Sequence, residues 1–186
     1  MFDVNHFYHI LTASDLTKTY GTSNKLVVKL ADNNGNVTPN AKINVTINNK
    51  VTPITTDSNG KATMPINLKP GTYTAVISYD DDQITAKIVV KKITPKLTAS
   101  QKTFKKSVNK KSYTVTLKNN QNKPMSGKYV TLTVNKKTYK VKTNSKGQAT
   151  FKITNLKNKG TFKAVVKYAG DNYYNSKTVN TKITVK

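Results

Sequence analysis

The 186-residue sequence contains no cysteine, no tryptophan, no arginine and no glutamate. Without cysteine, neither disulfides nor thiolate zinc sites can stabilise the chain, so each folding unit must bury an adequate hydrophobic core. Arginine is the residue whose planar side chain recognises bases and phosphates through bidentate contacts, so its absence disfavours sequence-specific nucleic-acid binding. No apolar run approaches the roughly 20 residues that a membrane-spanning helix needs.

The charge is strongly one-sided. All 32 basic residues are lysine and all 8 acidic residues are aspartate, which gives a formal net charge of +24. Lysine is a flexible point charge, so a field of lysines suits a polyanion that is held without fine stereochemistry.

Two stretches of the chain nearly repeat each other. TDSNGKATMPI (56–66) matches TNSKGQATFKI (143–153), and GTYTAVISY (71–79) matches GTFKAVVKY (160–168). A period near 87 residues fits a whole small domain and is far longer than a solenoid unit. The motif KKITPK provides a short, proline-stiffened linker. We therefore predict an N-terminal segment of unassigned role, a first repeat and a second, basic repeat, at residues 1–10, 11–93 and 94–186.

Within each repeat, apolar residues alternate with polar ones, as in Leu26-Val28-Leu30 and Tyr113-Val115-Leu117. This period of two is the signal of half-buried strands, and no segment shows the 3.6-residue period of a helix. About seven such strands per repeat predict an all-β protein with two tandem immunoglobulin-like β-sandwich domains.

The first repeated stretch, at residues 56–66 and 143–153, predicts a tight turn in each repeat. Asp57 and Asn144 can form Asx turns, and Gly60 and Gly147 supply the positive φ that such a turn needs. We assign these residues a structural role.

Lysine divides unevenly between the repeats. Residues 1–93 contain 10 lysines and 7 aspartates, whereas residues 94–186 contain 22 lysines and 1 aspartate. The fold cannot require this charge, because the sister repeat folds without it. Protection of strand edges and a codon bias toward lysine should act on both repeats equally. The predicted polyanion-binding residues occupy outward strand positions of the second repeat: Lys140, Lys142, Lys152, Lys163, Lys167 and Lys182.

Catalysis is not expected. His6 and His9 lie in the N-terminal segment without a nucleophile motif. Asp171 is the only acid of the second repeat, so a pair of carboxylates cannot act there. The sequence has no phosphate-cradling glycine loop. We predict a protein that is not an enzyme and needs no cofactor.

Several other sites are weaker candidates. Asp80, Asp81 and Asp82 could attract calcium, but they fall short of a ligand set and suit a solvated hairpin tip better. Tyr173 and Tyr174 could stack on sugar, although one of them is expected to close the core. Asn36 and Asn44 begin glycosylation sequons. A Lys–Asn isopeptide crosslink is disfavoured, because no inward strand position carries lysine.

Several segments of both repeats resemble a known family. SYTVTLKNN (112–120), VTLTVNKKTYKVKTNSKGQATFKI (130–153) and the segment 160–186 resemble the basic C-terminal Ig-like domain of adhesin-like surface proteins of methanogenic archaea. LADNNGNVTPNAKINVTIN (30–48) and the segment 56–81 resemble the Ig-like repeats that precede it. The resemblance implies a secreted, multi-repeat stalk on a pseudomurein wall, whose glycan has an acidic sugar and whose peptides contain glutamate.

Charge and resemblance together predict an extracellular, monomeric piece of a larger cell-surface protein. The first repeat would be a spacer, and the second would attach electrostatically to the acidic cell-wall polymer. The alternative is an adhesin tip that binds a glycan or protein of a partner cell or host through its loops. The charge alone also permits nonspecific nucleic-acid binding, which the absence of arginine disfavours.

Overall fold

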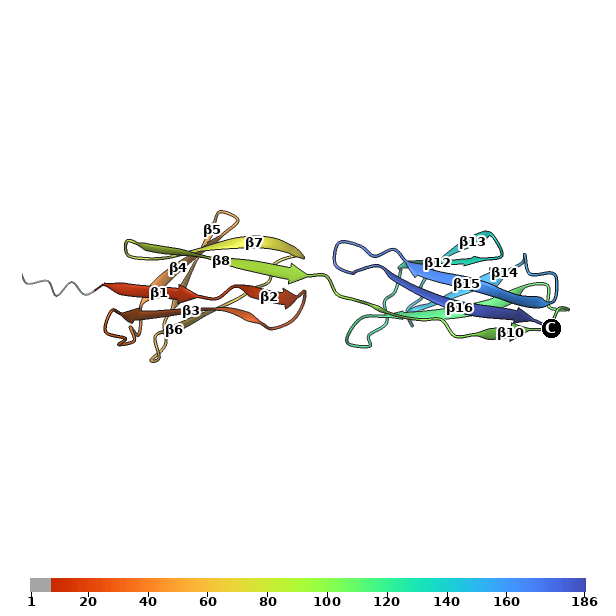
Figure 1. Ribbon diagram of the computed structural model, residues 1–186, viewed down its shortest axis with the longest axis horizontal. Coiled ribbons are helices and arrows are strands. Elements are labelled where there is room, and N and C mark those ends of the chain that lie inside the picture. Colours follow the sequence, from red (N-terminus) through yellow and green to blue (C-terminus); the bar gives the residue numbers. More distant parts are fainter. Residues whose placement is uncertain (1–7) are drawn as a thin grey trace, which may run out of the picture. The chain divides into compact units, whose positions relative to one another are not determined.

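The computed structural model describes residues 8–186, which form strands and contain no helix (Figure 1). The chain divides into two compact units, Met1–Lys91 and Lys92–Lys186, which are called the first and second unit below. Of the predicted N-terminal segment 1–10, residues 1–7 lie outside the described part. His9 and Ile10 belong to the first strand, so the structured repeat begins earlier than residue 11.

The first unit consists of two sheets. The three-stranded sheet has the order β1 (His9–Ala13), β3 (Lys25–Asp32), β6 (Lys61–Pro65). The five-stranded sheet has the order β2 (Leu16–Thr19), β8 (Asp82–Lys91), β7 (Gly71–Tyr79), β4 (Lys42–Ile47), β5 (Lys50–Thr55). All strand pairs in these two sheets are antiparallel except the parallel pair of β2 with β8.

The second unit repeats this topology strand for strand. Its three-stranded sheet has the order β9 (Lys96–Thr98), β11 (Lys111–Lys118), β14 (Gln148–Ile153). Its five-stranded sheet has the order β10 (Lys102–Phe104), β16 (Lys177–Val185), β15 (Gly160–Tyr168), β12 (Tyr129–Val134), β13 (Lys137–Lys142). Both units are therefore β-sandwiches, as the two-residue periodicity predicts.

Within residues 8–186, each unit has eight strands where about seven are predicted. The additional strand arises because the first segment of each repeat changes sheets. In the first unit, β1 pairs antiparallel with β3, and the chain then crosses so that β2 pairs in parallel with β8 in the other sheet. β9 and β10 do the same in the second unit. In each unit, one of these short strands forms an edge of the three-stranded sheet and the other forms an edge of the five-stranded sheet. The sequence analysis predicted a single strand for the two together.

The alternating apolar residues line two separate cores, as predicted. Leu26, Ile43 and Ile77 are fully buried in the first unit, and Leu132 and Phe151 are fully buried in the second. Because each sandwich buries its own core, each is expected to fold as an independent unit.

Two strand lysines are buried, so the expectation that no inward strand position carries lysine is wrong. Lys18 is 6% exposed and donates hydrogen bonds to the carbonyl oxygens of Ile66 and Asn24. Lys111 is 2% exposed and donates to the carbonyl oxygen of Val108. In both cases the aliphatic stem is buried while the ammonium is hydrogen-bonded to backbone carbonyl oxygen. These partners are backbone oxygens and not the asparagine and carboxylate that an isopeptide crosslink requires.

The predicted turns form at both copies of the repeated motif. Gly60 has φ +66° and Gly147 has φ +71°. The side-chain oxygens of Asp57 and Asn144 each accept backbone N–H groups two and four residues ahead. A Cβ atom on Gly147 would lie 2.4 Å from the carbonyl oxygen of Leu117. Both the positive φ and this close approach therefore require glycine.

We expect Gly147→Ala to lower the free energy of unfolding of the second unit by about 1–3 kcal/mol, through left-handed strain and a backbone clash. Gly127→Ala is a suitable control, because Gly127 also has a positive φ but a Cβ atom there would meet nothing within 4 Å. Urea unfolding of both variants measures the difference. Equal destabilisation would show that the contact with Leu117 adds nothing.

Candidate functional site

Five of the six predicted lysines lie on one surface of the second unit. Lys140 and Lys142 are on β13, Lys163 and Lys167 are on β15, and Lys182 is on β16. All five residues are exposed, and all three strands belong to the five-stranded sheet. We call the outward side of this sheet the lysine face. The sixth residue, Lys152, is exposed on β14 and belongs to the other sheet. It therefore does not share the lysine face.

Strand register arranges these lysines in rows. Thr131 on β12 is paired with both Lys140 and Lys167, so these three residues form one row across the sheet. Lys163 and Lys182 are direct partners in a second row. Neighbouring strands are about 4.8 Å apart and alternate residues on a strand about 7 Å apart, so adjacent lysines on the face are separated by roughly 5–14 Å.

The same face of the first unit carries much less charge. The strand order is identical, so positions can be matched by register. Pro53, Thr55, Thr74 and Ser78 occupy the positions of Lys140, Lys142, Lys163 and Lys167. The outward lysines of that sheet are Lys42, Lys87 and Lys91, of which Lys87 matches Lys182 and Lys42 matches Tyr129. The four additional lysines are thus specific to the second unit.

Negative charge is removed from two turns of the second unit while the backbone hydrogen bonds of these turns are kept. Asp32 and Asp57 in the first unit each accept two backbone N–H groups, at 2.8–3.0 Å. Asn119 and Asn144 take their places and accept the same two N–H groups, at 2.9–3.0 Å. An asparagine oxygen replaces one carboxylate oxygen in shape and as an acceptor, so the turns remain and only the charge disappears.

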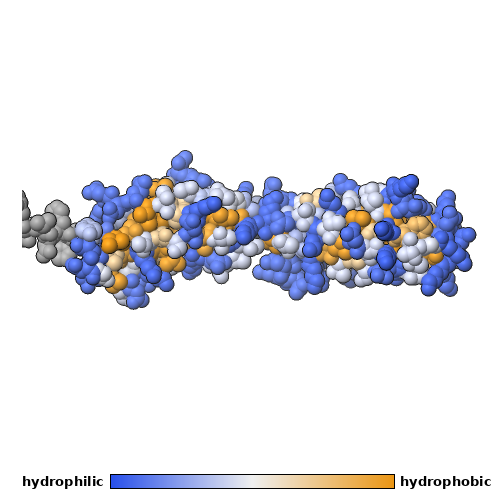
Figure 2. Space-filling view, viewed as in Figure 1, coloured by the Kyte–Doolittle hydropathy of each residue, from blue (hydrophilic) through white to orange (hydrophobic). Residues whose placement is uncertain are grey.

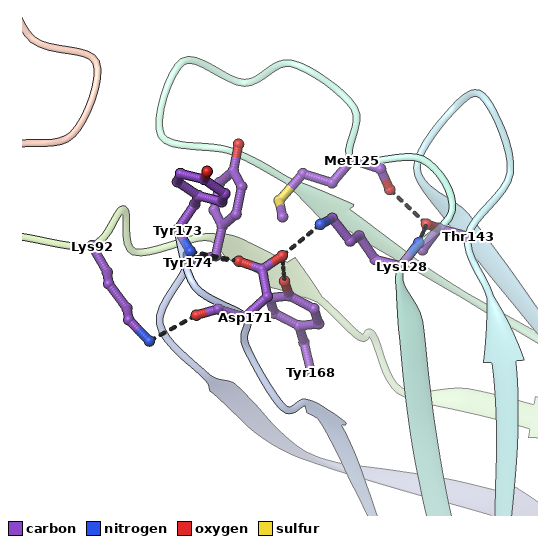
Figure 3. A network of polar contacts seen from close by, with 8 residues as sticks. All are labelled: Lys92, Met125, Lys128, Thr143, Tyr168, Asp171, Tyr173 and Tyr174. Carbon is purple, nitrogen blue, oxygen red and sulfur yellow. Dashed lines mark hydrogen bonds and ion pairs between the residues drawn. The ribbon is translucent and has the colours of Figure 1, made fainter. Parts of the chain in front are cut away.

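Asp171, the only acid between residues 92 and 186, lies inside a network of donors (Figure 3). Its Oδ1 accepts the N–H groups of Tyr173 and Tyr174 at 2.8 and 2.9 Å. Its Oδ2 accepts the Lys128 ammonium and, at 3.1 Å, the Tyr168 hydroxyl. Its backbone carbonyl accepts the Lys92 ammonium at 2.7 Å. The carboxylate is thereby neutralised within the β15–β16 loop.

These contacts shift two pKa values in opposite directions. Partial burial alone would raise the pKa of Asp171, but the hydrogen bonds from Lys128, from two backbone N–H groups and from Tyr168 lower it to about 2. Burial, followed by the hydrogen bond to the Asp171 carboxylate, raises the pKa of the Tyr168 hydroxyl. Asp171 is therefore ionised and paired at any physiological pH, and it adds no free negative charge to the surface.

Tyr173 and Tyr174 are half-buried and belong to this network. Tyr174 packs against the core, and the Lys128 ammonium lies 5.6 Å from its ring centroid. The carbonyl of Tyr173 accepts the N–H of Ile93 at 2.9 Å, which ties the start of the second unit to the loop. Both tyrosines thus have structural contacts, and the proposal that they stack on sugar stays a prediction.

Tyr129 is an exposed residue of the lysine face that the sequence analysis missed. Its side chain is 51% exposed. The ammonium groups of Lys140 and Lys142 lie 4.4 and 5.0 Å from its ring centroid. The outward phase of Tyr129, directly before buried Val130, was a signal that could have revealed it.

Figure 2 shows how hydrophilic residues (blue) and smaller hydrophobic patches (orange) share the visible surface.

The three aspartates of the first unit form a hairpin tip. Tyr79 and Asp82 are strand partners, and the turn consists of Asp80, which has φ 47°, and Asp81. Among residues 8–186, no three histidine, cysteine or acidic side chains are grouped so as to hold a metal ion.

We expect millimolar calcium to leave the melting temperature of the chain unchanged, because a two-residue turn supplies too few oxygen ligands. Differential scanning calorimetry with and without calcium tests this. A rise of several degrees that Asp81→Asn abolishes would show that the hairpin tip binds calcium.

The two sequon asparagines differ in their surroundings. Asn44 is exposed on β4, whereas the Asn36 side chain donates a hydrogen bond to Asp32 at 2.9 Å. Both asparagines are exposed, and the Asn36 amide is held by its hydrogen bond to Asp32. Across residues 8–186, no helix is long and apolar enough to cross a membrane.

No protein-family model and no curated protein matches the sequence. Solved structures do resemble the chain. The titin domains Z1Z2, crystallised with telethonin, share 12% identity at a TM-score of 0.51, with 96% of each chain covered. Another titin segment shares 12% identity at a TM-score of 0.50, with 97% of this chain and 65% of that chain covered.

These likenesses establish the architecture. The fold is that of tandem immunoglobulin-like domains. Invasin, a bacterial integrin-binding protein, also matches, with 16% identity and a TM-score of 0.47 over 96% of this chain and 40% of its own. At such identities, similarity to the tandem immunoglobulin-like domains concerns the fold alone, and function must be argued from the surface of each unit.

Proposed function

We propose that this chain is a non-enzymatic part of an adhesin-like cell-surface protein. In this proposal the second unit attaches electrostatically to an acidic cell-wall polymer through the lysine face, and the first unit is a spacer. The observation that carries the proposal is the pairing of added lysines with lost carboxylates. Two turn aspartates of the first unit correspond to asparagine in the second unit, and four outward positions correspond to lysine. Both differences move the charge of the second sandwich in the same direction.

The spacing of the lysines favours collective binding. Charges on the face are roughly 5–14 Å apart, which is comparable with the Debye length of about 8–10 Å at physiological ionic strength. Their fields therefore overlap above the sheet. Mutual repulsion among these cations opposes folding, and an anionic partner that covers the face would relieve it. This gives the excess charge a reason to persist in a domain whose sister does without it.

The shape of the face favours a polymer. The lysines extend over three strands of a sheet and are not gathered in a deep pocket, so a chain with many carboxylates would contact more of them than a small ligand would. Pseudomurein, with its acidic sugar and its glutamate-containing peptides, is the polymer that the archaeal resemblance suggests. An extracellular, wall-associated location follows from the same proposal.

The test separates the two units. Each sandwich has its own core, so residues 1–91 and 92–186 can be produced separately. We expect the second unit to cosediment with purified pseudomurein and the first unit to stay in solution. Binding should fall log-linearly as salt rises, because each neutralised carboxylate releases counterions. Equal binding of both units, or binding of the second unit that ignores salt, would contradict the proposal and favour glycan recognition through loops.

A further inference from the structure

Tyr129 is placed in a shallow groove on the lysine face. The groove has a volume of about 550 Å³, and its lining includes Tyr129, Thr131, Lys140 and Lys167. Half of the Tyr129 side chain is exposed to solvent, and two lysine ammonium groups lie within 5.0 Å of its ring centroid. The groove thus combines a flat aromatic ring, a hydroxyl group and several cations in one place.

Electrostatic attraction of a polyanion requires the lysines but does not require the aromatic ring of Tyr129. At the matching position the first unit has Lys42, which pairs with Thr55 as Tyr129 pairs with Lys142. The second unit is richer in lysine almost everywhere, yet at this position it has an uncharged ring instead of a lysine. A face selected only for positive charge would have kept the lysine. The ring therefore points to a ligand that offers an apolar surface as well as negative charge.

We infer that the groove is a subsite for a carboxylated sugar residue of the polymer, an inference that rests on the proposed function. The C–H face of a pyranose ring would pack on Tyr129, since an aromatic ring offers apolar area with little entropy cost. The sugar carboxylate would pair with Lys140 or Lys167, and a ring hydroxyl would hydrogen-bond Thr131. Lysine stems are flexible, so the ammonium of Lys140 can move from the ring to the carboxylate.

The row register agrees with a saccharide chain. Lys140 and Lys167 flank Thr131 two strands apart, which is about 10 Å, a separation that an extended disaccharide spans. Further along the face, hydroxyl groups of Thr133 and Thr138 hydrogen-bond each other at 2.8 Å. Asp171 also lines the groove, but its carboxylate is paired with Lys128 and does not repel an anion as a free carboxylate would.

Other polyanions fit the groove less well. Single-stranded nucleic acid is held by successive stacking aromatics, whereas Tyr129 is the only exposed aromatic side chain among the strands of the lysine face. An acidic polypeptide would satisfy the lysines but has no ring for Tyr129 to contact. A sugar acid is the class of ligand that uses all three features.

The decisive variant is Tyr129→Lys, which installs the residue of the first unit and adds a positive charge. Binding of the full chain is measured by calorimetry at low salt with oligogalacturonate, with poly-L-glutamate of equal carboxylate number and with oligo-dT. We expect Tyr129→Lys to weaken oligogalacturonate binding about five- to tenfold while poly-L-glutamate binds as well as before or better. Tyr129→Phe keeps the ring and should stay within about twofold for both probes.

Each other outcome overturns the subsite. If Tyr129→Lys binds oligogalacturonate more tightly, charge alone operates at this position. If both carboxylate polymers lose affinity equally, Tyr129 only positions lysines. If oligo-dT loses as much as oligogalacturonate, the ring stacks on bases. Failure of the unaltered chain to bind any of the polyanions would instead refute the proposed function itself. Circular dichroism of Tyr129→Phe and Tyr129→Lys confirms that both variants fold.

Discussion

Exchanging Lys140, Lys142, Lys163 and Lys167 for Pro, Thr, Thr and Ser should weaken binding to an acidic polymer at low salt on the order of 10²- to 10³-fold. The estimate takes about 1 kcal/mol for each lysine next to an anionic surface and about 1.4 kcal/mol for each factor of ten. The salt dependence should also become shallower, because fewer counterions are released when fewer charges are neutralised. Binding isotherms from low to roughly half-molar salt measure both quantities.

The four-residue variant is expected to fold. Its residues are those that the first unit has at the same register positions, where they face outward. Proline is acceptable at position 140 because β13, like β5 with its Pro53, is the last strand of its sheet. Proline is tolerated on edge strands, where its missing N–H leaves no ladder bond unmade. Relief of repulsion among the lysines should offset part of any lost packing.

A matched control removes the same charge elsewhere. Lys110, Lys123, Lys152 and Lys157 are exposed residues of the second unit that lie in loops or on β14, away from the lysine face. Changing these four to serine leaves the net charge equal to that of the first variant. If binding depends on the face, the control should lose several-fold less affinity. Equal losses would show that the whole unit acts as a diffuse charge and that the face has no special role.

The sequence was sufficient to predict the fold and, for most strand residues, whether the side chain points into the core or outward. The two-residue alternation placed Leu132, Phe151 and Ile77 inside and Lys163 and Lys167 outside, as the structure has them. The alternation states whether a residue points in or out, but not which sheet its strand joins. Consecutive strands β13 and β14 belong to different sheets, so Lys142 and Lys152 face opposite sides. Sheet membership depends on long-range pairing, which local periodicity does not contain.

Lys111 and Tyr129 escaped prediction because residue type was given more weight than position. Lys111 has the inward phase of Tyr113 and Val115 and is buried, but lysine was assumed to be outside. Tyr129 has the outward phase of Thr131 and Thr133 and is exposed, but its counterpart in the first unit is a lysine, so the comparison of repeats did not mark it. The donors around Asp171 come from β15, from the β15–β16 loop, from the turn before β12 and from the segment before β9. No local pattern could have placed them together.

The persistence of Asp171 has a physical explanation. Asn119 and Asn144 each serve two backbone N–H groups through one oxygen, which an amide can supply. Asp171 serves four donors, two at each oxygen. An asparagine would turn its NH₂ group toward the Lys128 ammonium or toward the Tyr168 hydroxyl, and the donors would be left without acceptors. The second unit therefore retains its single carboxylate where charge and two oxygens are both needed.

We therefore expect Asp171→Asn to lower the free energy of unfolding of the second unit by about 2–4 kcal/mol, because it leaves a partly buried ammonium unpaired and a hydroxyl without its acceptor. Asn144→Asp is the matched control. It restores the carboxylate found at Asp57 in a turn that needs only one oxygen, and it should change stability by less than about 1 kcal/mol. Hydrogen exchange of peptides from β15 and β16 in the full chain reports on the second unit separately.

The acid dependence of stability should single out the same residue. The pKa of Asp171 is about 2 in the folded protein and takes its ordinary value near 4 in the unfolded chain. A carboxyl group whose pKa is lowered by folding stabilises the native state fully above its unfolded pKa, and this contribution disappears as the pH falls through the folded value. Protection of β15 and β16 should thus decline between about pH 4 and pH 2. Because the second unit has no other acidic side chain, Asp171→Asn should abolish most of that decline. A variant that keeps the full acid dependence would mean that Asp171 is not what holds the β15–β16 loop.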